Sequence, residues 1–135
     1  MALFEWTEKI SVGVKVFDDQ HKKLIGYINE LHEAMKNRQG KEVLEKIFID
    51  LENYTKTHFN HEITVLKAEK YPDLDEHLRQ HHKLVEQLVE LKDKHAAGKL
   101  FVSSQTMEFL KKWLTDHIMG HDKKYSGFLD SKNIQ

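Results

Sequence analysis

The chain has 135 residues, which is enough for one domain with its own hydrophobic core. With 39% hydrophobic residues, 32% charged residues and a net charge of −1, it lacks the strong positive charge typical of proteins that bind nucleic acids or anionic membranes. It contains no cysteine, which excludes disulfides, thiolate metal sites, iron–sulfur clusters and a cysteine nucleophile.

Residues 1–17, MALFEWTEKISVGVKVF, have no basic region followed by an apolar run, so they do not resemble a secretory signal. No apolar stretch in the chain reaches the roughly 18 residues of a membrane span, and we expect a cytoplasmic protein. The segment is predicted to be an ordered arm packed on the rest of the domain through Phe4, Trp6, Val12, Val14 and Phe17.

Two helices are predicted next, over residues 18–38 and 41–69, because apolar residues recur there with the period of an α-helix. The first is expected to start near Asp18 and Asp19, acidic residues suited to a helix N-terminus, and to stop around Gly40. The apolar stripes are Leu24, Ile25, Ile28, Leu31 and Met35 in the first helix, and Leu44, Ile47, Phe48, Leu51, Tyr54, Val65 and Leu66 in the second.

Two more helices are predicted over residues 73–95 and 103–129. Asp73 and Glu76 have the spacing of a capping box at the start of the third. The connections are short, and one proline and six glycines are few for a turn-rich β fold. We therefore expect a single all-α domain, an up-down-up-down four-helix bundle with the N-terminal arm packed on it.

Histidine is unusually frequent, with ten residues in the chain. His58 and Glu62 are four residues apart, as are His77 and His81, so each pair lies on one face of its helix, in line with the apolar stripe. The other two helices also carry histidines on their apolar faces, at His21 and His117. One such histidine is usually a core residue with a hydrogen-bond partner. Five of them beside a carboxylate predict a metal site in the bundle core, because unsatisfied buried polar groups are costly.

Imidazole and carboxylate ligands suit iron, zinc, copper or manganese. A structural zinc site needs four ligands, and more than four are present. The sequence contains no Glu-x-x-His, which disfavours a ferritin-like di-iron site. Haem is a weaker alternative, because one or two axial ligands leave the other histidines unexplained.

Five segments of the sequence resemble the hemerythrin family, in particular its single-domain bacterial members. They are FEWTEKISVGV, FDDQHKKL, HFNHE, YPDLDEHLRQH and WLTDHIMGHD, and they span almost the whole chain. The resemblance implies two iron ions per chain, bridged by an oxo or hydroxo group and by the two carboxylates of Glu62 and Asp122. It also implies reversible binding of dioxygen at the iron that has an open coordination position.

The resemblance assigns the five histidines to the two irons. It places His77, His81 and His117 on one iron, and His21 and His58 on the other, where dioxygen binds. It implies an apolar pocket around the dioxygen, with walls from Leu24, Phe59, Leu66, Trp113 and Ile118. Family members commonly have glutamate and methionine where this chain has Ile63 and Leu66, and these departures concern the pocket rather than the metal ligands.

The family's pattern and the α-helical period favour different residues as the ligand that follows His117. A step of five residues turns about 140° around an ideal helix, so the period favours His121 as the next ligand, whereas the family's pattern selects Asp122. We follow the family's pattern. The remaining histidines are expected at helix edges or on the surface, with His61 and His121 as candidates for contact with a ligand; the set is His32, His61, His82, His95 and His121.

The leading functional hypothesis is therefore an oxygen-binding protein for storage, delivery or scavenging, and not an enzyme beyond a minor peroxidase-like activity. One alternative is reduction of peroxide or nitric oxide at the same irons. Another is an oxygen or redox sensor that acts in trans. We expect a monomer whose partner is dioxygen, without nucleic acid, membrane or an identified protein partner.

Overall fold

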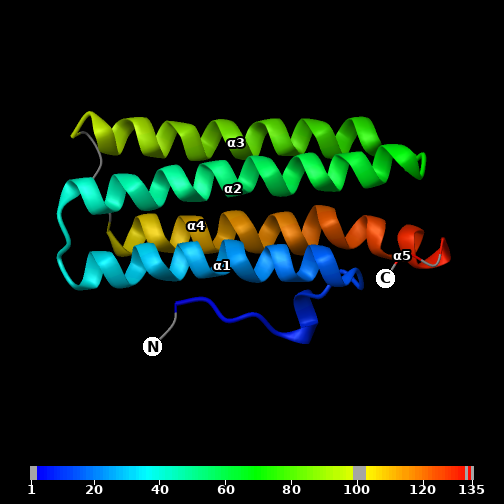
Figure 1. Cartoon of the computed structure of the whole chain (residues 1–135), viewed down its shortest axis with the longest axis horizontal. Helices are drawn as coiled ribbons and strands as arrows, with labels where there is room; N and C mark the ends of the chain where they lie inside the picture. The colour runs from blue at the N-terminus through cyan, green and yellow to red at the C-terminus, as the bar shows by residue number, and fades with distance from the viewer. Residues whose placement is uncertain (1–2, 99–102, 133, 135) are drawn as a thin grey trace.

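Four long helices run back and forth along one axis (Figure 1). They are α1 (Lys15–Lys36), α2 (Lys41–Ala68), α3 (Leu74–Ala96) and a fourth made of α4 (Ser104–Asp116), the π-helical segment η2 (His117–Asp122) and α5 (Lys123–Ser131). The computed structural model describes residues 3–98, 103–132 and 134, and no strand occurs among them. The chain is the all-α, up-down-up-down four-helix bundle that its sequence predicts.

The start of α1 lies at Lys15, earlier than the acidic pair at which we expected it. Asp18 does not begin the helix but reaches back from its first turn. Its carboxylate accepts hydrogen bonds from the Ser11 hydroxyl at 2.6 Å and from the Val12 backbone N–H at 2.8 Å. The Asp18 carboxylate therefore holds the arm against α1 and does not mark the start of the helix.

The third and fourth helices start differently from each other. The prediction of a capping box at Asp73 was wrong, because the Asp73 side chain makes no capping hydrogen bond to α3. At the start of α4 the side chain of Ser103 does cap the helix, and it accepts from the backbone N–H of Thr106 at 3.3 Å.

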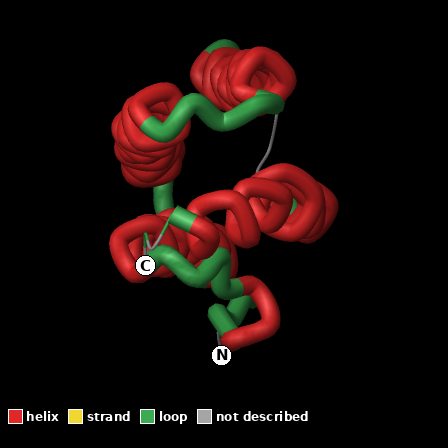
Figure 2. Tube along the Cα trace, turned by 90° about the vertical axis from the view of Figure 1, so that its right-hand side faces the viewer, coloured by secondary structure: helices red, strands yellow, loops and turns green. Residues whose placement is uncertain are grey.

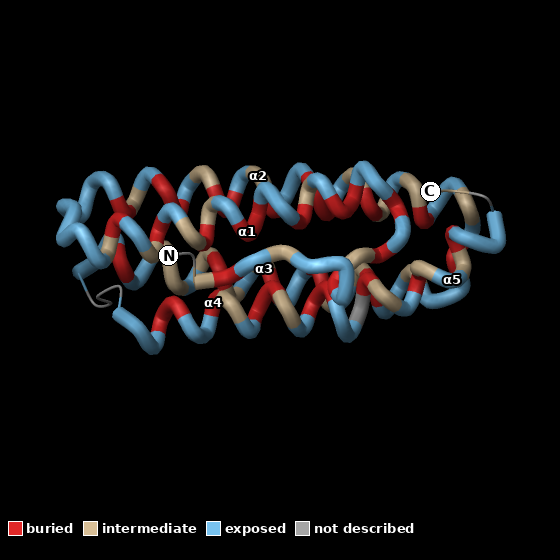
Figure 3. The backbone as a smooth tube through the Cα atoms, turned by 90° about the horizontal axis from the view of Figure 1, so that it is seen from below, coloured by how far each residue is buried: buried red, intermediate tan, exposed pale blue. Residues whose placement is uncertain are grey.

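The four long helices surround a common interior in the end-on view (Figure 2). The apolar stripes are buried in one core, and the buried residues lie on the inner sides of the helices (Figure 3). The N-terminal arm lies along α1 (Figure 1). There the backbone of Phe4 exchanges two hydrogen bonds with the side chain of Asn29, at 2.9 and 2.8 Å. Ser126 of α5 donates to the Val12 carbonyl at 2.7 Å, so the arm connects the first helix with the last. None of the described helices has the length and apolarity that crossing a bilayer would require.

Candidate metal centre

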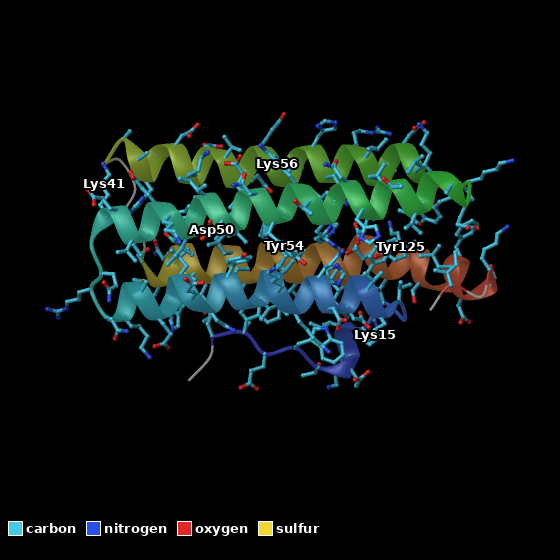
Figure 4. All side chains as sticks on the ribbon, in the orientation of Figure 1. Lys15, Lys41, Asp50, Tyr54, Lys56 and Tyr125 are labelled. Carbon is cyan, nitrogen blue, oxygen red and sulfur yellow. The ribbon has the colours of Figure 1, made fainter. Side chains whose placement is uncertain are left out.

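Seven buried histidine and carboxylate side chains from all four long helices meet inside one half of the bundle. None is more than 5% exposed, and the set is His21 from α1, His58 and Glu62 from α2, His77 and His81 from α3, and His117 and Asp122 from η2. They lie towards the end at which α1 begins and α2 ends. Lys15 and Tyr125 are at that end of Figure 4, and Lys41 is at the other.

Regular α-helix positions five of the seven groups. His58 and Glu62 are one turn apart on α2, and His77 and His81 are one turn apart on α3, so each helix points two donors in one direction. His21 lies near the start of α1 and meets the pair on α2. The rings of His21 and His58 are 4.6 Å apart between centroids.

The last two groups depend on the π-helical segment. An α-helix brings residues four apart onto one face, whereas the i→i+5 hydrogen bonds of a π-helix do this for residues five apart. His117 and Asp122 are the first and last residues of η2, and the His117 Nε2 atom lies 3.0 Å from Asp122 Oδ2. The π-helix therefore explains why the carboxylate belongs at position 122 in spite of the α-helical period. The side chain of His121 lies outside the described part of the structure.

The carboxylate of Glu62 divides the five imidazoles into two sets. Its Oε2 atom faces the Nε2 atoms of His58, at 3.3 Å, and His21, at 3.6 Å. Its Oε1 atom faces the Nε2 atoms of the other three histidines: 3.0 Å for His81, 3.2 Å for His77 and 3.8 Å for His117. One oxygen of Glu62 thus lies near two histidines, and the other lies near three.

Asp122 also contacts both sets. Its Oδ2 atom is 2.8 Å from His21 Nε2 and 3.0 Å from His117 Nε2, and its Oδ1 atom is 3.3 Å from His77 Nε2. Both carboxylates therefore lie between the two sets of imidazoles.

The donor atoms fall into two overlapping groups in which all atoms lie within 4.8 Å of one another. Glu62, His117 and Asp122 belong to both groups; His21 and His58 complete one, and His77 and His81 the other. Several of these atoms are fully buried and close to each other without forming hydrogen bonds, among them His21 Nε2, His58 Nε2 and both Asp122 oxygens. Metal-ligating atoms that converge in this way suit a cation at their common focus, so the residues fit a two-metal site.

The imidazoles differ in their affinity for protons. At His21 and His77 burial lowers the pKa, but the nearby carboxylates of Asp122 and Glu62 outweigh the effect of burial and raise the pKa to about 9. At His58 and His81 burial dominates and lowers the pKa, to about 4 for His81.

The two carboxylates stay ionised in spite of their burial. Burial raises the pKa of both groups, but the surrounding imidazoles hold the pKa of Glu62 and of Asp122 well below its ordinary value. Two anionic carboxylates are thus balanced by the protons of His21 and His77 at neutral pH. A cation that takes this place must displace those protons.

Two polar side chains that support the cluster were not predicted from the sequence. The Tyr125 hydroxyl, fully buried, donates to Glu62 Oε2 at 2.7 Å. Gln20, next to His21, accepts a hydrogen bond from His58 Nδ1 at 2.6 Å. The position of Tyr125, one turn after Asp122, is the sequence signal that could have revealed it.

The apolar residues expected around dioxygen are all buried in the core: Leu24, Phe59, Leu66, Trp113 and Ile118. Phe59 contacts the cluster directly. Its ring stacks on His81 with centroids 3.8 Å apart and planes at 4°, and it lies 5.0 Å from the ring of His117. The Trp113 indole donates to the Leu84 carbonyl at 3.2 Å, which fixes its ring beside α3.

The remaining histidines are not all peripheral. His82 is exposed, and His32 and His61 are half-buried, as expected of helix-edge residues. The expectation for His95 was wrong. It lies on the inward side of the last turn of α3, is 5% exposed and packs against Phe48 with ring centroids 5.5 Å apart.

Comparison with known proteins gives one consistent result. The family model for the hemerythrin HHE cation binding domain matches residues 12–129. The chain is 33% identical to the bacteriohemerythrin of Methylococcus capsulatus, over 97% of this chain and 100% of that one. It is 32% identical to the myohemerythrin of Theromyzon tessulatum, over 93% of each chain. A crystal structure of wild-type hemerythrin superposes with a TM-score of 0.85 at 33% identity, covering 93% of this chain and 97% of the other.

Proposed function

The chain belongs to the hemerythrin family, and on that premise we propose that it holds two iron ions in the bundle core and binds dioxygen reversibly. The observation that carries the proposal is the pair of overlapping donor groups that share Glu62, His117 and Asp122. A site for one metal needs one such group. The relatives are named bacteriohemerythrin and myohemerythrin, and we describe the chain as a binding protein rather than an enzyme.

We assign each histidine to an iron according to which oxygen of Glu62 its Nε2 atom faces. The three histidines near its Oε1 atom would hold one iron, and the two near its Oε2 atom would hold the other, which would take up the dioxygen. His77, His81 and His117 would thus hold the first iron and His21 and His58 the second. Glu62 and Asp122, which contact both sets of histidines, would contribute to both. When bound, a pair of ferrous ions would supply the electrons for reversible binding of dioxygen.

The protein's own part is to position donors and exclude water. Tyr125 holds its proton on the hydrogen bond to Glu62 Oε2, and burial raises the pKa of Tyr125 well above its ordinary value, so this proton stays in place. Phe59 and Ile118, 4% and 0% exposed, belong to an apolar wall without competing hydrogen-bond donors. Such a wall disfavours the escape of charged, reduced oxygen species.

Anaerobic reconstitution with ferrous iron tests the proposal. We expect about two irons per chain and a visible charge-transfer band that appears with oxygen and fades under argon. Conversion in air to a ferric form that argon does not reverse would instead support reduction of peroxide or nitric oxide, or redox sensing. A metal content near zero after reconstitution would contradict the di-iron centre itself.

A further inference from the structure

Gln20 on α1 joins two histidines of α2 through its side-chain amide. Its Oε1 atom lies 2.6 Å from Nδ1 of His58, and its Nε2 atom lies 2.7 Å from Nδ1 of His61. His58 is fully buried with its Nε2 atom in the cluster, and His61 is half-buried at the edge of the bundle. A continuous line of hydrogen bonds therefore runs from the bundle edge to a metal-ligand candidate.

The two ends of an amide are chemically different, and this fixes the protons along the line. The Gln20 Nε2 group only donates, so Nδ1 of His61 must accept and His61 carries its proton on Nε2. The Oε1 atom only accepts, so Nδ1 of His58 must donate. A neutral His58 then has its lone pair on Nε2, the atom that points to Glu62.

His58 could instead carry its proton on Nε2 and donate it to Glu62. Glu62 Oε2 lies 3.3 Å from His58 Nε2 and would accept a proton from it. That proton would occupy the lone pair a metal needs. The contact to Gln20 is shorter, at 2.6 Å, and the His58 Nε2 atom makes no hydrogen bond of acceptable geometry. The distances favour the proton on Nδ1.

We propose that Gln20 is a positioning residue that holds His58 in its Nδ1–H form with Nε2 free for metal, and that His61 holds the Gln20 amide in the orientation this requires. The proposal rests on the proposed function for its consequence, which is tighter binding at the two-histidine iron. Its central claim is that the proton of neutral His58 lies on Nδ1, and this claim can be tested in the metal-free chain as well.

Phe17 encloses this line of hydrogen bonds. Its ring, fully buried, stands edge-on to His58 and to His61, with centroid distances of 6.1 and 5.4 Å. An apolar ring against both imidazoles leaves Gln20 as the polar partner that keeps their Nδ1 atoms satisfied.

The first experiment measures the protons directly, by long-range ¹H–¹⁵N correlation spectra of the metal-free protein at neutral pH. We expect neutral His58 with its proton on Nδ1 and neutral His61 with its proton on Nε2. The opposite form at His58 would overturn the proposal, whatever the chain binds.

The second experiment compares variants for His58 tautomer and for anaerobic ferrous affinity. Gln20→Leu removes the acceptor, and we expect a mixed His58 tautomer and a loss of about 10–100-fold in affinity for one of the two irons. Gln20→Glu keeps an acceptor facing His58 and should restore both properties. His61→Leu frees the amide to turn and should also give a mixed tautomer.

Gln80→Leu is the matched control, because Gln80 also directly precedes a candidate ligand, His81, but its amide donates to Glu76 on the surface of α3. It should behave as the unaltered chain does. Two irons in the unaltered chain with no change in Gln20→Leu would refute the positioning role and leave the proposed function intact. Failure of the unaltered chain to hold iron, with the expected tautomers, would refute the function and leave Gln20's role standing.

Discussion

His117 and Asp122 are five residues apart, yet His117 Nε2 lies 3.0 Å from Asp122 Oδ2. In a regular α-helix a five-residue step turns about 140°, which would point the two side chains in different directions. The π-helical segment between them brings both into the cluster. Such single π-turns are rare and occur often at functional sites.

Exchange of the residues at positions 121 and 122 tests this geometry. In the double variant His121→Asp/Asp122→His the carboxylate occupies the position that an uninterrupted α-helix would favour. We expect iron content to fall from two to one or fewer per chain, because the π-turn directs position 122 to the cluster. The control Asp116→Asn, an exposed residue directly before His117, should keep both irons. Full loading of the double variant would contradict the role of the π-turn.

The sequence predicts the parts of the centre that follow a regular period. The pairs His58–Glu62 and His77–His81 are visible as four-residue steps on apolar faces, and these steps also indicate the bundle. Asp122 is not predictable from periodicity. Its position depends on a π-turn, and a π-turn is set by local hydrogen bonds that the residue pattern does not indicate. Gln20 could not be found either, since its role depends on contact between α1 and α2.

Glu62→Gln tests the bridging position. The variant keeps the volume of the side chain but removes the charge that faces five imidazoles through its two oxygens. We expect fewer than one iron per chain by metal analysis. In the metal-free protein we expect a loss of about 3 kcal/mol in the free energy of unfolding in urea, since one partner of a buried charge network is missing. Glu86→Gln, exposed on α3, should change neither measurement.

Tyr125→Phe separates stability from metal binding. The variant keeps the ring in the core but removes the 2.7 Å hydrogen bond to Glu62 Oε2. A hydrogen bond to a charged acceptor contributes about 1.5–3 kcal/mol, so urea unfolding should show a loss of that size. Two irons should still bind, since Tyr125 is not among the donors. Tyr54→Phe, half-buried, is the control, and equal losses in both variants would contradict the special role of Tyr125.

The stability of the metal-free protein should depend on pH in both directions from about 6.5. The pKa of His21 and of His77 is raised to about 9, so their contribution is complete below the unfolded value of about 6.5 and is lost as the pH rises to 9. The pKa of His81 is lowered to about 4, so its contribution is complete above 6.5 and is lost as the pH falls to 4.

Thermal unfolding followed by circular dichroism from pH 4 to pH 9 checks this dependence. We expect Tm to be highest between pH 6 and 7 without metal. After loading with iron the decline towards pH 9 should disappear, because the metal replaces the protons of His21 and His77. A metal-free Tm that rises steadily from pH 6 to pH 9 would show that these two histidines are not protonated in the folded protein.

The donors all lie in one half of the bundle, whereas the turn between α1 and α2 lies at the opposite end (Figure 1). Bound metal would therefore join all four long helices to each other at one end. At the other end they are held by side-chain packing and by polar contacts such as that of Lys41 Nζ with the Ala96 carbonyl. Native-state hydrogen exchange should then be graded along the axis. Backbone amides around His58 would exchange only through global unfolding, while those around Leu44 would also exchange through local separation of the helix ends.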